Sequence, residues 1–130
     1  MDVIQEAEQV VRSLSADNYG NIYLTKTQIR KLLSAVNAIN NKLMVHLSQR
    51  SDAEGKSNEL PQELTAEIRY LEVKLLYQAG RGDKNVREFV DKAKMRERIT
   101  KAAKGVSEYK EFAQFMEAVV AFHKFHGGKD

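Results

Sequence analysis

Residues 25–47 read TKTQIRKLLSAVNAINNKLMVHL, and this stretch decides the class of fold. Its first four residues have the form of a capping box, in which the Thr25 hydroxyl accepts from the Gln28 backbone N–H and the Gln28 side chain reaches back. Apolar residues then recur every three or four positions, which predicts a long helix with one buried face and with Lys26 and Arg30 on the opposite face. The expected buried stripe consists of Ile29, Leu32, Leu33, Val36, Ile39, Leu43 and Leu47.

Two further helices flank this one along the chain. Apolar residues at helical spacing between Val3 and Leu14 predict a short first helix, which the turn-forming run 17–21 ends. A third helix is expected to begin at Pro61 and to end at Gly80, where glycine enters the left-handed C-cap conformation cheaply. Because its apolar line has a second apolar flank, we expect this helix to be the most buried. The line is Leu64, Ile68, Leu71 and Leu75, and the flank is Val73, Leu76 and Tyr77.

Two more helices follow. A fourth is expected from about Asp83 to Lys101, with a bend or a change of packing partner near Lys94, where its apolar line shifts sideways. A fifth is expected over about Ser107–His126 and is ended by two glycines. Its aromatic line is expected to be core rather than a stacking platform for bases, with Phe125 its most exposed member. The line consists of Phe112, Phe115, Phe122 and Phe125.

The sequence therefore predicts an all-α fold, a compact bundle of about five helices. A length of 130 residues suits a single domain over 1–130, with a mobile loop at about 48–60, of which residues 48–59 include no large apolar residue. The chain has no cysteine, which excludes disulfides and thiolate sites and fits a reducing cytoplasm. Its longest apolar run has five residues, whereas a bilayer-spanning helix needs about 20, so we expect no membrane segment.

Positive charge is concentrated in one part of the chain. The net charge is +3, and residues 1–60 are balanced, with seven basic and seven acidic side chains. Between Lys74 and Lys104 there are ten basic residues and four acidic ones. Such a surplus suits a polyanion-binding face, but a solvated helix carrying ion pairs has the same composition. Charge alone leaves both interpretations open.

Catalytic equipment is sparse. The chain has no Gly-x-Ser-x-Gly element and no glycine-rich phosphate loop, and its carboxylates are scattered among basic residues as in surface ion pairs. His123 and His126 lie three positions apart, a spacing at which two imidazoles can share a metal, but no further ligand stands at a telling distance. We therefore expect no catalysis, no cofactor and no metal.

The strongest candidate for phosphate binding, from the charge pattern, is one row of basic residues. Lys94, Arg98 and Lys101 lie at i, i+4 and i+7 with no carboxylate interleaved at i+4. Pairs one turn or less apart elsewhere are Lys26 with Arg30 and Gln78 with Arg81.

Three segments together resemble a known family. Residues 24–33 (LTKTQIRKLL) resemble an LTxxQIRK(F/L)L opening, and residues 75–81 (LLYQAGR) resemble an L-x-Y-Q-A-G-R element. Residues 115–128 (FMEAVVAFHKFHGG) resemble an F-x-EA-V-A-(F/Y)-HK-(F/Y)-x-GG ending. In order and spacing, over about residues 22–128, the chain is similar to the small all-helical subunit of the type III-A CRISPR effector complex, the second subunit in the Csm naming.

The resemblance implies a role in antiviral defence that composition does not show. Such subunits are non-catalytic, and several copies stack into a minor filament beside the backbone subunits that carry the crRNA. They contact the large signature subunit at one end, and their basic face lies along the target RNA, touching backbone rather than bases. The implied partners are the crRNA and target RNA, further copies of the chain, and the backbone and large subunits.

The matching segments carry over RNA-binding residues one by one, and the charge pattern adds others. The segments give Lys26, Arg30, Lys31, Gln78, Arg81, His123 and Lys124, and the charge pattern gives Lys94, Arg98 and Lys101. Arg30 and Gln78 have an alternative role, in which they cap or bridge helices.

Two other classes of function stay open from the residues. One is a DNA-binding helical regulator, with 80–82 as the turn before a recognition helix. The other is a protein–protein adaptor, or a helical-bundle enzyme that uses His123 and Glu117. A footprint on a defined DNA duplex would support the first, and turnover abolished by Glu117→Gln would support the enzyme.

Overall fold

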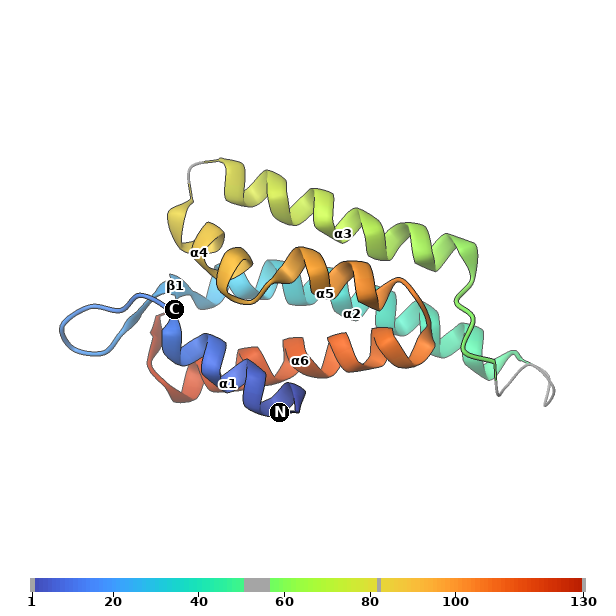
Figure 1. Ribbon diagram of the computed structural model, residues 1–130, viewed down its shortest axis with the longest axis horizontal. Coiled ribbons are helices and arrows are strands. Elements are labelled where there is room, and N and C mark those ends of the chain that lie inside the picture. Colours follow the sequence, from blue (N-terminus) through green and yellow to red (C-terminus); the bar gives the residue numbers. More distant parts are fainter. Residues whose placement is uncertain (1, 51–56, 82, 130) are drawn as a thin grey trace.

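The computed structural model describes residues 2–50, 57–81 and 83–129, and Figure 1 shows their arrangement. Six helices and two very short strands occur in these residues, so the predicted all-α fold is confirmed. They are α1 (Val3–Ser13), β1 (Ile22–Thr25), α2 (Lys26–Ser48), α3 (Gln62–Gly80), α4 (Lys84–Lys92), α5 (Met95–Ala102), α6 (Val106–Phe125) and β2 (Gly128–Lys129). Within the described ranges, none of the helices combines the length and apolar character that crossing a membrane requires.

Helix α2 begins at the predicted capping box. The Thr25 backbone N–H donates to Gln28 Oε1 at 2.8 Å, and the Gln28 backbone N–H donates to Thr25 Oγ1 at 3.2 Å. The predicted stripe faces the core, where α2 contacts α3 on one side and α6 on the other. The local sequence signal thus gives both the start and the buried face of this helix.

Helix α6 forms the centre of the core and contacts α1, α2 and α5 (Figure 1). Tyr109, Phe115 and Met116 are completely buried. The Tyr109 hydroxyl donates to the Val36 carbonyl of α2 at 2.9 Å, and burial raises the pKa of this phenol. The aromatic line is core as predicted, and Phe125 is exposed. The buried helix at the centre is therefore α6.

The expectation that α3 is the most buried helix is wrong. Its line Leu64, Ile68, Leu71 and Leu75 is buried, but its second apolar flank is exposed. The helix itself runs along the upper edge of Figure 1. Val73 is 53% exposed and Tyr77 is 69% exposed. Helix α3 packs on α2, α4 and α5, and no element among the described residues covers its other side.

The expected fourth helix is two helices. Lys94 lies between α4 and α5 with φ 52° and ψ 47°, a left-handed conformation that interrupts the helical hydrogen bonds. The sideways shift of the apolar line near Lys94 therefore marks a break rather than a bend. Gly80 ends α3 as predicted, but it does not adopt a positive φ, so the reason given for that boundary is wrong.

The pairing of β1 with β2 brings the end of α6 to the start of α2. Ile22 and Gly128 are partners in this parallel pair, and the Ile22 N–H donates to the Gly127 carbonyl at 3.0 Å. Behind the pair, the ring of His123 is buried, and its Nε2 lies 2.6 Å from the Leu24 carbonyl. Because a carbonyl oxygen only accepts, the ring proton is on Nε2.

The two glycines after α6 are required by this closure. Gly127 has φ +93°, a region that disfavours side chains. A Cβ on Gly128 would lie 2.0 Å from Cε1 of His123. The His123 ring therefore occupies the space that any side chain at position 128 would need.

Asn58 caps the other end of α6. Its carbonyl accepts from the Val106 N–H at 2.8 Å, and its side-chain Oδ1 accepts from the Ser107 N–H at 2.8 Å. Asn58 lies in the segment predicted to be a mobile loop, of which residues 51–56 lie outside the described residues. The described part after them is thus held against α6, while the loop's mobility stays a prediction.

We predict that Gly128→Ala destabilises the protein by about 1–3 kcal/mol, since the added methyl overpacks the His123 ring. Urea unfolding followed by circular dichroism measures the loss.

The matched control is Gly80→Ala, because a Cβ there meets no atom within 4 Å. This helical position should become more stable by about 0.5–1 kcal/mol. Equal unfolding midpoints for the two variants would contradict the role assigned to Gly128.

Candidate nucleic-acid interface

The three segments with family-like motifs meet at one end of the bundle. The start of α2, the end of α3 with the start of α4, and the end of α6 all lie toward the left side of Figure 1. Gln28 connects two of them, because its side-chain amide donates to the carboxylate of Asp83. That carboxylate also accepts from the Val86 N–H at 3.1 Å and so caps α4. One polar contact therefore fixes the starts of α2 and α4 together.

Four of the predicted RNA-binding residues line one groove at this end. Lys26 and Arg30 of α2 and Lys124 of α6 surround a depression of about 250 Å³, which we call the terminal groove. Arg30 and Lys124 are exposed, whereas Lys26 is half-buried and has an interaction within the chain. The other lining residues are Ile29, Val120, His123 and Gly128, so none of the described lining residues is acidic. The groove is cationic and open to an anion.

Lys31 and Arg81 are exposed outside this groove. Lys31 follows Arg30 directly and therefore projects about 100° around the helix from it. The Arg81 guanidinium lies 5.8 Å from the ring centroid of Tyr77 and faces solvent. Gln78 is half-buried beside Gln28 and Phe89, which fits the alternative in which it bridges helices.

In the row of Lys94, Arg98 and Lys101, Lys94 is exposed, whereas Arg98 is engaged by other parts of the molecule. The Arg98 guanidinium lies 3.8 Å from the Phe115 ring centroid, its Nε donates to the Ala93 carbonyl at 2.7 Å, and its Nη1 lies 3.4 Å from a carboxylate oxygen of Glu6. Arg98 thus joins α1, α4 and α6. The spacing rule used on the sequence covers only carboxylates one turn away on the same helix. Glu6, the partner of Arg98, lies on α1 and is therefore missed by that rule.

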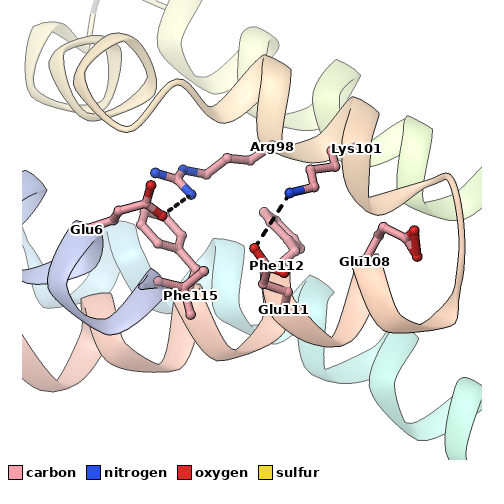
Figure 2. Close-up of a pocket in the computed structure, with 8 residues that line it drawn as sticks. Glu6, Arg98, Lys101, Glu108, Glu111, Phe112 and Phe115 are labelled. Carbon is pink, nitrogen blue, oxygen red and sulfur yellow. Dashed lines mark hydrogen bonds and ion pairs between the residues drawn. The ribbon is translucent and has the colours of Figure 1, made fainter. Parts of the chain in front are cut away.

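Figure 2 shows the hollow at this row. Arg98 points toward Glu6 and Phe115, and Lys101 points toward Glu111, whose carboxylate lies 3.7 Å away. Glu108 also lines the hollow, and hydrogen bonds from Asn58 and Ser107 lower the pKa of its carboxyl. With three carboxylates and two cations, the lining of this hollow carries no surplus of positive charge.

The histidines are held by other groups. His123 is only 2% exposed and bonds the Leu24 carbonyl, so we leave it out of the proposed contact set. His126 Nε2 lies 2.9 Å from a carboxylate oxygen of Glu8 on α1. Within the described residues, no three His, Cys, Asp or Glu side chains gather as a metal site would require. Both imidazoles serve to join the end of α6 to its neighbours.

A sequence model of the family described as Csm2 Type III-A matches residues 1–129. The chain belongs to the Csm2 family. A curated relative from Streptococcus thermophilus, named CRISPR system Cms protein Csm2, is 39% identical over 98% of this chain and 93% of its own length. A relative with the same name from Mycobacterium tuberculosis (strain ATCC 25618 / H37Rv) is 33% identical over 99% of this chain and 94% of its own. The resemblance found from three motifs is thereby confirmed.

In this Csm2 family chain, each of the three motifs has a structural role at the end of the bundle where the motifs lie. The first begins α2 through the Thr25–Gln28 capping box, and the last supplies His123 and the glycine beneath its ring. The middle motif ends α3 next to the Asp83 cap. The motifs therefore build the frame around the terminal groove, and only their exposed cations are left for a ligand.

We predict that Arg98→Met destabilises the protein by about 2 kcal/mol, because it removes a desolvated cation–π contact and a charged hydrogen bond. Thermal or urea unfolding measures the change.

The control is Lys101→Met, which removes only an exposed ion pair and should change stability by less than about 1 kcal/mol. A stable Arg98→Met protein with weakened RNA binding would instead restore the interpretation of this row as a polyanion site.

Proposed function

We propose that this chain is a non-catalytic small subunit of a type III-A CRISPR RNA-guided interference complex, forms its minor filament and binds the backbone of the crRNA–target RNA. Membership of the Csm2 family over residues 1–129 supports a place in such a complex. The observation that carries the RNA contact is the terminal groove, where Lys26, Arg30 and Lys124 gather with no acidic lining residue among those described.

The chemistry of the groove suits phosphates rather than base edges. Arg30 offers a planar fork that donates two parallel charged hydrogen bonds to one phosphate, and Lys124 adds a point charge. Apart from these two cations, Lys26 and His123, whose ring is already bonded, the lining side chains are apolar. Contacts of this kind carry no sequence information, and an effector that reads any target through its guide requires that property.

Protein partners are part of the same proposal. Further copies of the chain and the backbone and large subunits of the complex would cover apolar side chains that face solvent in the single chain. Met44 and Val45, in the second half of α2, are 67% and 56% exposed. Leu43, Met44 and Leu47 also line a largely apolar depression against α6. Exposed apolar surface of this kind favours a protein partner. We place the complex in the cytoplasm.

We predict that Arg30→Glu combined with Lys124→Glu lowers the affinity for a guide–target RNA duplex about tenfold or more. Losing two phosphate contacts should also reduce the magnitude of the log–log salt slope by about 1.4–1.8. Fluorescence polarisation across a salt series measures both quantities, and co-purification of RNA with the assembled complex measures retention where many weak contacts act together.

The matched control is Lys104→Glu with Lys110→Glu. It makes the same change in net charge with two exposed cations at the other end of α6. If the control variant lost as much RNA, net charge alone would explain the loss seen with the Arg30/Lys124 variant. Full RNA retention by a complex that contains the Arg30/Lys124 variant would remove the terminal groove from the RNA site.

A further inference from the structure

The outward side of α3 carries a repeated pair of an aromatic ring and a cation. Tyr70 is followed four residues later by Lys74, whose Nζ lies 5.7 Å from the ring centroid. Tyr77 is followed four residues later by Arg81, whose guanidinium carbon lies 5.8 Å from the ring centroid. The two pairs are seven residues apart, which is about two helical turns, so they lie on the same side of the helix. We call these four residues, with Val73 between them, the tyrosine–cation face.

This face is open and positively charged. Tyr70 and Tyr77 are 56% and 69% exposed. Neither Lys74 nor Arg81 forms an ion pair with a described residue. Nearby carboxylates on α3 are engaged elsewhere: Glu67 lies 2.6 Å from Lys42 Nζ. Likewise, Glu72 lies 2.9 Å from Arg96 Nε. Lys74 and Arg81 are thus held over aromatic rings, and no described carboxylate neutralises their charges.

We propose that the tyrosine–cation face binds single-stranded nucleic acid, with bases stacked on Tyr70 and Tyr77 and phosphates on Lys74 and Arg81. A repeated unit of ring plus cation matches a polymer whose own repeating unit is a planar base plus a phosphate. Aromatic stacking accepts every base, so the contact is independent of sequence. The inference rests on the proposed function for the choice of RNA as the polymer, but it uses a different surface from the terminal groove.

The geometry leaves room for bases beside the rings. Seven residues of helix separate the two tyrosines by about 10.5 Å along the axis, so each ring takes a base of its own. Tyr70 and Lys74 also line a groove of about 500 Å³ between α3 and α2. Ala35, Ala38 and Ala66 line the same groove, and their small side chains keep it wide. A protein partner would instead need carboxylates placed against both cations.

The test compares single-stranded oligo(A) with an abasic oligonucleotide of the same length, by fluorescence polarisation of the full chain across a salt series. Tyr70→Leu with Tyr77→Leu should weaken oligo(A) binding about tenfold or more, leave abasic binding unchanged and keep the salt slope. Lys74→Gln with Arg81→Gln should weaken binding of both probes and reduce the slope by about 1.4. Tyr19→Leu, at a ring 91% exposed elsewhere, is the control and should change nothing.

Three outcomes would overturn the inference. They are unchanged oligo(A) binding by the double tyrosine variant, equal loss for the two probes, and no oligo(A) binding by the wild-type chain at low salt. Sedimentation of the same variants identifies the alternative, since altered self-association with normal RNA binding would make this face a protein interface. The variant with Arg30→Glu and Lys124→Glu, measured in parallel, separates the two proposals. Unchanged binding by the variants of one surface contradicts the proposal for that surface and leaves the proposal for the other surface intact.

Discussion

The hydrogen bond between the His123 ring and the Leu24 carbonyl closes the bundle, and the terminal groove depends on it. It joins the end of α6 to Leu24 of β1, two residues before α2 begins, over 99 positions of sequence. The β1–β2 pair reinforces the same junction, and Gly128 leaves the space that the ring fills. Arg30 of α2 and Lys124 of α6 line the same groove because of this junction. The buried hydrogen bond between His123 and Leu24 thus positions Arg30 and Lys124. Both cations are exposed, and neither has an ion pair with a described residue.

The cations of this protein divide into those that hold the fold and those that face outward. Arg98 lies over the Phe115 ring and binds the end of α4, so its charge is used inside the molecule. Arg30 and Arg81 have no ion pair with any described residue and remain exposed. Burial and contacts, rather than the density of Lys and Arg along the chain, separate the two groups. The basic stretch that stands out in the sequence is therefore not one continuous binding surface.

Local signals predicted the helices well, and contacts between distant segments account for most of the errors. The capping box at Thr25 and the apolar stripe of α2 are encoded within a few residues, so they can be read directly. The partner of Arg98 is Glu6, 92 positions away, and no spacing rule along one helix reveals it. The exposure of Tyr77 follows from the lack of a covering element on the outer side of α3. The groove cations were found through family motifs, while their shared location required the structure.

The cap on α6 restricts how the connection between α2 and α3 can change in length. Asn58 is held at the N-terminus of α6, and Arg50 donates to the Ser57 carbonyl at 2.7 Å and to the Glu59 carbonyl. The chain from Ser57 to the start of α3 is therefore fixed at several points. One residue added or removed between Asn58 and Pro61 would shift the cap out of register. The four positions that follow Ser57 should accordingly keep a constant length among homologues.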